Sequence, residues 1–95
     1  MISFIVRMRF DAEDHDKVRE TLHDLAAASV QEQGCVSYVP HFLEDDPETV
    51  VIYEQYQDQA ALNSHRNSPH FQQHAVGGLY QMMLERSIEN LTAIA

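Results

Sequence analysis

The sequence has few of the residues on which several protein classes depend. Its 95 residues include one cysteine, no tryptophan, three glycines and three prolines. The single cysteine, Cys35, cannot form an intramolecular disulfide, and no zinc-finger spacing is possible. There is no glycine-rich phosphate loop and no dinucleotide-binding fingerprint, so a bound nucleotide or flavin has no visible site. No apolar run is as long as a membrane-spanning helix.

Basic residues are also scarce. Six Lys+Arg stand against 15 Asp+Glu, which gives a formal charge of -9. Such an acidic surface repels phosphate backbones and anionic lipid, so we expect neither a nucleic-acid partner nor a membrane partner. The first residues lack the pattern of a secretory signal, and we therefore expect a cytoplasmic protein. The length fits one domain over residues 1–95.

The first half of the chain predicts a strand, a helix and a second strand. Apolar residues alternate over residues 2–10, as in a strand with one buried face. Asp11 is placed to cap the start of a helix, and Gly34 is expected to end it. Residues 35–43 read as the second strand, and Pro40 favours a position at the edge of the sheet.

The second half predicts a hairpin partner, two helical segments and a last strand. A polar loop over residues 44–48 leads to a third strand over 49–57. Asp58 caps a short helix, Ser68-Pro69 opens another, and residues 84–93 form the fourth strand. The order strand, helix, strand, strand, helix, strand predicts a ferredoxin-like α+β fold, with one antiparallel sheet and the helices on one face.

The middle strands are apolar on both faces. In the third strand Val51 and Tyr53 alternate with Val50 and Ile52. In the second strand we expect Val36, Tyr38 and Phe42 on one face, with Cys35, Val39 and Leu43 on the other. Because two helices cover only one face of a sheet, a second copy of the chain is expected to cover the other. The sequence thus predicts a homodimer.

Two side chains stand out as candidates for chemistry. His65 follows Ala61 and Leu62 at helical spacing, so it is either a hydrogen-bonded core histidine or a general base. Glu54 shares a strand face with Ile52 and Tyr56, where a carboxylate needs a partner. The sequence leaves open whether Glu54 pairs with an arginine (Arg7, Arg9 or Arg86), orients His65, or has a raised pKa.

A metal site is not expected. His70 and His74 lie four residues apart on one helix, a spacing that a metal ion could use, but spacing alone places no third ligand near them. Cys35 is expected to be a small buried side chain, because no histidine is paired with it.

The residues also resemble a known family. The segments Glu32-x-Gly34-Cys35-x-x-Tyr38 and Tyr53-Glu54-Gln55-Tyr56-x-Asp58-x-x-Ala61-Leu62-x-x-His65-x-x-Ser68-Pro69-His70-Phe71 are similar to the antibiotic biosynthesis monooxygenase family. That family includes quinol monooxygenases and the enzyme that processes the phosphorylated autoinducer of quorum sensing. Many members have a tryptophan where this chain has Tyr56, and the absence of tryptophan argues against the haem-degrading branch.

The resemblance implies a dimeric α+β barrel that uses molecular oxygen on a small aromatic substrate, without a metal or an organic cofactor. The leading hypothesis is therefore a cofactor-independent monooxygenase of a quinol or a similar phenol. In this hypothesis His65 is the base, Glu54 holds it in place, and four side chains shape an apolar substrate pocket: Tyr38, Tyr56, Phe71 and Met82. Two alternatives are an isomerase of a small phosphorylated metabolite and a non-catalytic dimeric binding module.

Overall fold

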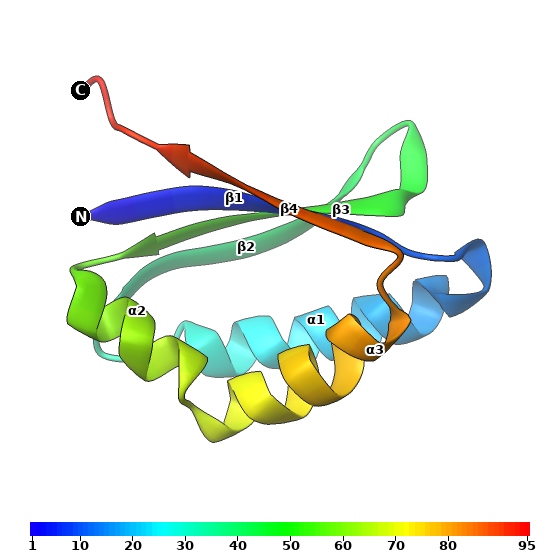
Figure 1. Ribbon diagram of the computed structural model, residues 1–95, viewed down its shortest axis with the longest axis horizontal. Coiled ribbons are helices and arrows are strands. Elements are labelled where there is room, and N and C mark those ends of the chain that lie inside the picture. The colour runs from blue at the N-terminus through cyan, green and yellow to red at the C-terminus, as the bar shows by residue number, and fades with distance from the viewer.

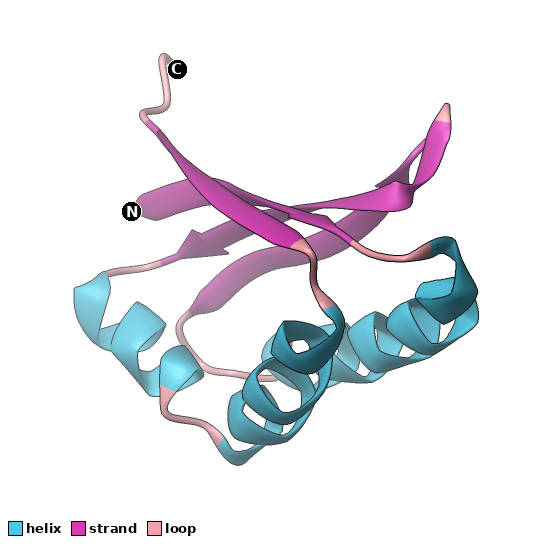
Figure 2. Cartoon of the chain, turned by 45° about the vertical axis from the view of Figure 1, so that its right-hand side comes forward, coloured by secondary structure: helices cyan, strands magenta, loops and turns pink.

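The computed structural model describes residues 1–95 and has two layers, a four-stranded antiparallel sheet and a layer of helices on one of its faces (Figures 1 and 2). The elements are β1 (Ile2–Arg9), the 3-10 helix η1 (Ala12–Asp14), α1 (His15–Ser29), β2 (Cys35–Leu43), β3 (Asp46–Tyr56), α2 (Gln59–Arg66), the π-helix η2 (Phe71–Leu79), α3 (Tyr80–Met82) and β4 (Glu85–Leu91).

The strands lie in the order β2-β3-β1-β4, and β1 pairs antiparallel with both β3 and β4. This is the predicted ferredoxin-like arrangement. The position of Pro40 on an edge strand is confirmed, because β2 has β3 as its one neighbour. None of the helices is both long enough and apolar enough to span a membrane.

Helix starts follow the capping residues that the sequence offers. Asp11 accepts a hydrogen bond from the backbone N–H of Glu13 at 3.0 Å, and Asp58 accepts one from Ala61 at 2.8 Å. The predicted stop at Gly34 is wrong, since α1 already ends at Ser29. Gly34 serves a different purpose, because a Cβ there would lie 2.3 Å from the Cβ of Ala61 and would force α2 away from the sheet.

The core lies between the helices and the inner face of the sheet. Alternating residues of β1, and the residue that follows the strand, are buried there as predicted. Residues at helical spacing on α1 are buried against them. The buried apolar residues of these segments are Phe4, Val6, Met8, Phe10, Val18, Leu22 and Leu25.

In β2 the predicted division of faces is correct from Tyr38 onward and wrong at the start of the strand. The pairing shifts between Cys35, which opposes Tyr56, and Ser37, which opposes Gln55, so Val36 is an extra residue. The bulge moves Cys35 to the inner face with Tyr38, while Val36 is exposed. A bulge moves every residue before it to the opposite face of the sheet. A face assignment that assumes strict alternation along the strand cannot detect this change.

The loop between β2 and β3 is shorter than predicted. Leu43 pairs with Asp46, and the turn itself contains two residues, Glu44 and Asp45. Phe42 then pairs with Val50, so residues 47–49 have no partner on β2. The polar residues that predicted a longer loop therefore lie partly in an irregular start of β3.

The helix that crosses back under the sheet is a π-helix over nine residues. Its i→i+5 hydrogen bonds make each turn longer than in an α-helix. At its end the backbone N–H of Tyr80 bonds to the carbonyl of Ala75, five residues earlier. A Cβ on Gly78 would lie 3.2 Å from Cγ2 of Thr21 in α1, so the two helices approach closely at this point.

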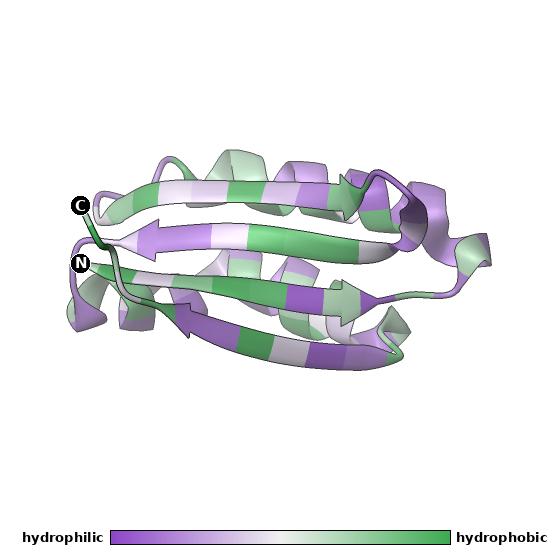
Figure 3. Ribbon diagram, turned by 90° about the horizontal axis from the view of Figure 1, so that it is seen from above, coloured by the Kyte–Doolittle hydropathy of each residue, from purple (hydrophilic) through white to green (hydrophobic).

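The outer face of the sheet carries no helix. Figure 3 looks onto this face, with the four strands in front of the helices and a continuous green apolar stretch in the middle of β3. Val39, Leu43 and Leu91 are exposed, and Ile5 and Tyr53 are half-buried. The sheet therefore has apolar side chains on both faces, which is the basis of the predicted dimer. No other part of the chain covers the outer face.

Candidate active site

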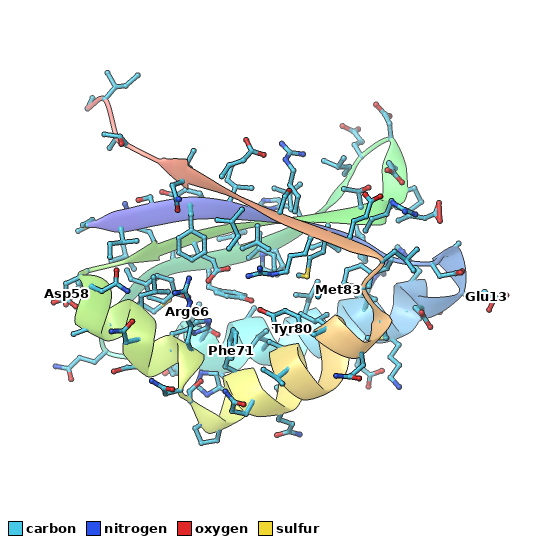
Figure 4. All side chains as sticks on the ribbon, viewed as in Figure 1. Glu13, Asp58, Arg66, Phe71, Tyr80 and Met83 are labelled. Carbon is cyan, nitrogen blue, oxygen red and sulfur yellow. The ribbon has the colours of Figure 1, made fainter.

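A small cavity lies between the inner face of the sheet and the π-helix η2. Its volume is about 30 Å³, room for a single water molecule, and apolar side chains form most of its wall. In Figure 4 the labelled Arg66, Phe71 and Tyr80 lie in the layer between the helices and the sheet. Four side chains that can carry a charge, Glu54, His65, Arg66 and Arg86, complete the wall.

His65 is held at the end of α2 and is 2% exposed. Its Nδ1 lies 2.8 Å from Oε2 of Glu32. Its ring packs tilted or edge-on against Tyr38, Tyr56 and Phe71, with centroids 5.2–5.6 Å away. Burial lowers the pKa of His65, although the bond to Glu32 opposes this effect. The ring is therefore both a hydrogen-bonded core histidine and part of the cavity wall.

This hydrogen bond fixes the state of the ring. Glu32 Oε2 accepts, so Nδ1 of His65 carries the proton, and in the neutral ring Nε2 has a free lone pair. Nε2 faces Glu54, with 3.8 Å between this nitrogen and Oε1. The prediction that Glu54 holds His65 in place is thus wrong, because the hydrogen bond that orients the ring is made to Glu32 and not to Glu54.

Glu54 is buried on β3 and accepts a hydrogen bond of 2.7 Å from the hydroxyl of Tyr56. Burial raises the pKa of Glu54 to about 7, and the Tyr56 hydroxyl and the charges of Arg66 and Arg86 limit the rise. Of the roles that the sequence leaves open for Glu54, pairing with an arginine is wrong. Arg7 and Arg9 lie on the outer face of the sheet, where both bond to glutamates of β4, and Arg86 forms no ion pair with Glu54.

Glu32 binds a second histidine. Nε2 of His70 also lies within hydrogen-bond distance of its Oε2, while Oε1 is buried without a partner. Glu32, His65 and His70 are the one group of three side chains close enough to hold a metal ion. Each imidazole uses a nitrogen to bond the carboxylate, so the structure shows a hydrogen-bonded cluster. His70 bonds to Glu32 and its ring lies near that of His65, and His74 is not part of the group.

The structure brings some of the expected pocket residues to the cavity and not others. Tyr38 and Phe71 line it. Tyr56 is fully buried behind Glu54 and does not reach the wall. Met82 does not line the cavity either; it packs partly buried against the core, while Leu79 and Tyr80 line the cavity wall.

Cys35 is half-buried. Burial, together with the charges of Glu32 and Glu54, raises the pKa of its thiol to about 11. The thiol is therefore protonated near neutral pH and a poor nucleophile. This agrees with the expectation of a small packed side chain.

Sequence reasoning did not find the bond of Glu32 to His65 or the place of Arg66 on the cavity wall, and it considered Arg86 as a possible partner of Glu54. Glu32 is 33 positions from His65 in the chain, so no local spacing links them. It stands in the same short motif as Gly34 and Cys35, which was the available signal. Arg66 and Arg86 also line the cavity, from α2 and from β4, and only the strand register reveals that Arg86 points inward with its partner Met8.

The arrangement supports proton transfer at the cavity wall. Glu54, with a pKa near neutrality, can gain or lose a proton with little cost. The bare Nε2 of His65 lies next to it and can accept a proton from a hydroxyl group in the cavity. Beyond His65, Glu32 and the partly exposed His70 continue the chain of hydrogen bonds toward solvent.

Comparison with known proteins gives a consistent result. The sequence model of the antibiotic biosynthesis monooxygenase family matches residues 1–76. No curated protein matches the sequence.

Several solved structures share the fold. A conserved protein of unknown function from Bacteroides thetaiotaomicron, described as a possible oxidoreductase, is 27% identical with a TM-score of 0.87, over 95% of this chain and 94% of that one. A protein from Pseudomonas aeruginosa is 26% identical with a TM-score of 0.90, over 99% and 94%. An antibiotic biosynthesis monooxygenase is 24% identical with a TM-score of 0.91, over the whole of both chains.

Proposed function

Because the chain belongs to the antibiotic biosynthesis monooxygenase family, we propose that it is an oxidoreductase that adds one atom of dioxygen to a quinol or another electron-rich phenol. The reaction is proposed to need no metal and no organic cofactor. The observation that carries the proposal is the buried pair of Glu54 and His65 on the wall of an otherwise apolar cavity.

The chemistry balances without an external reductant. A hydroquinone and one dioxygen give a hydroxyquinone and one water, so the substrate supplies all four electrons. The hydroxyl proton passes to Nε2 of His65, and the resulting phenolate gives one electron to dioxygen. The two radicals then form a C–O bond, and loss of water from the peroxide leaves the new carbonyl.

Each side chain of the site has a part in this scheme. His65 is the base, and Glu32 holds its ring in the tautomer that leaves Nε2 free. Glu54, whose pKa is about 7, stabilises the imidazolium that forms and can take over the proton. The apolar wall from Phe71 and Leu79 keeps water from the phenolate.

The cavity must widen for this substrate. At about 30 Å³ it holds a water molecule, whereas sites for small organic ligands are several hundred Å³. Tyr80 and Arg86 line it and stack on one another, and Arg86 belongs to β4, whose seven residues are all exposed. Movement of these two side chains is the access route that the fold offers.

A homodimer is part of the proposal. The outer face of the sheet has apolar side chains and no helix, and a second copy of the same face is the cover that symmetry makes simplest. Light scattering at micromolar concentration is expected to give about twice 10.9 kDa. A monomer under these conditions contradicts this part of the proposal.

The activity is tested by oxygen uptake with hydroquinone and naphthohydroquinone, on protein whose metal and flavin content has been measured. Uptake above the spontaneous rate should rise with protein concentration and fall in His65→Gln. The exposed His23→Gln is the matched control and should behave as the parent. Turnover of a sugar phosphate without oxygen uptake would instead favour the isomerase, and binding without turnover would favour the binding module.

A further inference from the structure

Three of the six basic side chains of this acidic protein have a polar partner within the chain, and the exposed Lys17 on α1 has none. Arg7 and Arg9, on the outer face of the sheet, form ion pairs with Glu89 at 2.6 Å and with Glu85 at 3.3 Å. Arg19 bonds to a ring nitrogen of His15. The chain has 15 acidic side chains for six basic ones, so a shortage of carboxylates does not explain an arginine without an ion pair.

The two arginines of the cavity are without such a partner. Neither Arg66 nor Arg86 forms an ion pair with a carboxylate. Neither guanidinium donates a hydrogen bond to a protein group, and Arg86 instead lies over the ring of Tyr80, 5.3 Å from its centroid. Stacking holds a guanidinium in place and leaves its N–H donors free for a ligand.

The two side chains reach the cavity from different elements. Arg66 is the last residue of α2, and Arg86 is on β4, opposite Met8 of β1. Both line the cavity that contains Glu54 and His65. Their charges also lower the pKa of Glu54, so the positive field extends to the reacting end of the cavity.

We infer that Arg66 and Arg86 form a binding site for an oxyanion on the substrate, and that the substrate class is a hydroxylated aromatic acid and not a neutral quinol. This inference rests on the proposed function and deepens it. The apolar wall takes the ring, His65 meets the hydroxyl group, and the two guanidiniums take the anionic group at the rim. Guanidinium groups match carboxylates and phosphates with paired N–H donors, and the bonds gain from the charge on both partners.

Binding is tested without oxygen, so that no turnover interferes. Calorimetry compares hydroquinone with 2,5-dihydroxybenzoate, which adds one carboxylate to the same ring. The acid should bind at least about tenfold more tightly, because one charge-assisted hydrogen bond contributes about that much affinity. Arg66→Gln and Arg86→Gln should each remove most of this preference and change the affinity for hydroquinone little.

Two controls isolate the site. Arg7→Gln removes a positive charge from the outer face and should keep the preference. Arg86→Lys keeps the charge and should retain part of it. Phenyl phosphate against benzoate then distinguishes a phosphate ligand from a carboxylate.

Equal affinity for the neutral and the acidic probe, no binding of either, or a preference that survives both glutamine variants would overturn the inference. A preference that depends on the arginines, in a protein that takes up no oxygen with either probe, would keep the anion site and overturn the monooxygenase. The two proposals therefore fail separately.

Discussion

Replacing Glu54 by glutamine should make the stability of the protein less dependent on pH. Glu54 is 5% exposed, and its carboxyl group has one hydrogen bond, from the hydroxyl of Tyr56. Burial raises its pKa from 4.5 to about 7. In the unfolded chain the same group is in water and has its ordinary pKa.

The sign follows from proton binding. Between pH 4.5 and about 7 the folded protein keeps a proton on Glu54 that the unfolded chain has lost. Stability therefore falls as the pH rises through this range and levels off above it. At about 1.4 kcal/mol for each pH unit, the loss from this one group is about 3 kcal/mol. Glutamine cannot ionise, so its variant lacks this loss.

The measurement is the free energy of unfolding in urea for the parent and for Glu54→Gln, at about pH 4 and about pH 8. The difference between the two proteins should change by about 3 kcal/mol in favour of the variant at the higher pH. Glu20→Gln removes an exposed carboxylate from α1 and should show no such change. A constant difference between parent and Glu54→Gln would refute the reasoning, because it would mean that Glu54 is not desolvated in the folded protein.

Four further changes test other parts of the site and fold. His65→Gln should cost about 100-fold or more in turnover and no more than about 2 kcal/mol in stability, measured by oxygen uptake and melting temperature; a large fall in stability with full turnover would make the histidine structural. Tyr56→Phe removes the donor to Glu54, so the pKa of Glu54 should rise and the pH profile of turnover should move to higher pH; an unchanged profile contradicts this. Gly34→Ala should lower the unfolding free energy by about 1–3 kcal/mol, because its Cβ would overlap a side chain of α2, and an unchanged midpoint in urea would contradict the contact. The purified protein should contain no stoichiometric metal by elemental analysis, and zinc that is lost in His70→Ala would contradict this.

The fold could be predicted from the sequence because its signals are local. Asp11 and Asp58 cap the helices that follow them, and the alternation in β1 gives the buried face correctly. The errors occur where the period changes within an element. One extra residue at Val36 exchanges the two faces at the start of β2, and after the π-helix Tyr80 lines the cavity where Met82 was predicted to do so.

The site was less predictable because its contacts join distant parts of the chain. His65 and Glu54 were found because a titratable residue in an apolar pattern is visible in the sequence alone. Their partners were not, since the bond from Glu32 to His65 spans 33 residues and depends on the path of the loop after α1. The inward direction of Arg86 depends on the register between β4 and β1. Neither the contact of Glu32 with His65 nor the direction of Arg86 produces a periodic pattern in the sequence.

The two interpretations of His65, a core histidine or a base, turn out to require the same contact. A buried imidazole needs a partner for its N–H, and Glu32 supplies it at 2.8 Å. That partner places the proton on Nδ1 and leaves the lone pair of Nε2 directed toward Glu54 and the cavity. Burial, which lowers the pKa of His65, also keeps the ring neutral and able to accept a proton near pH 7. The interaction that satisfies the histidine in the core is therefore also what would make it a base.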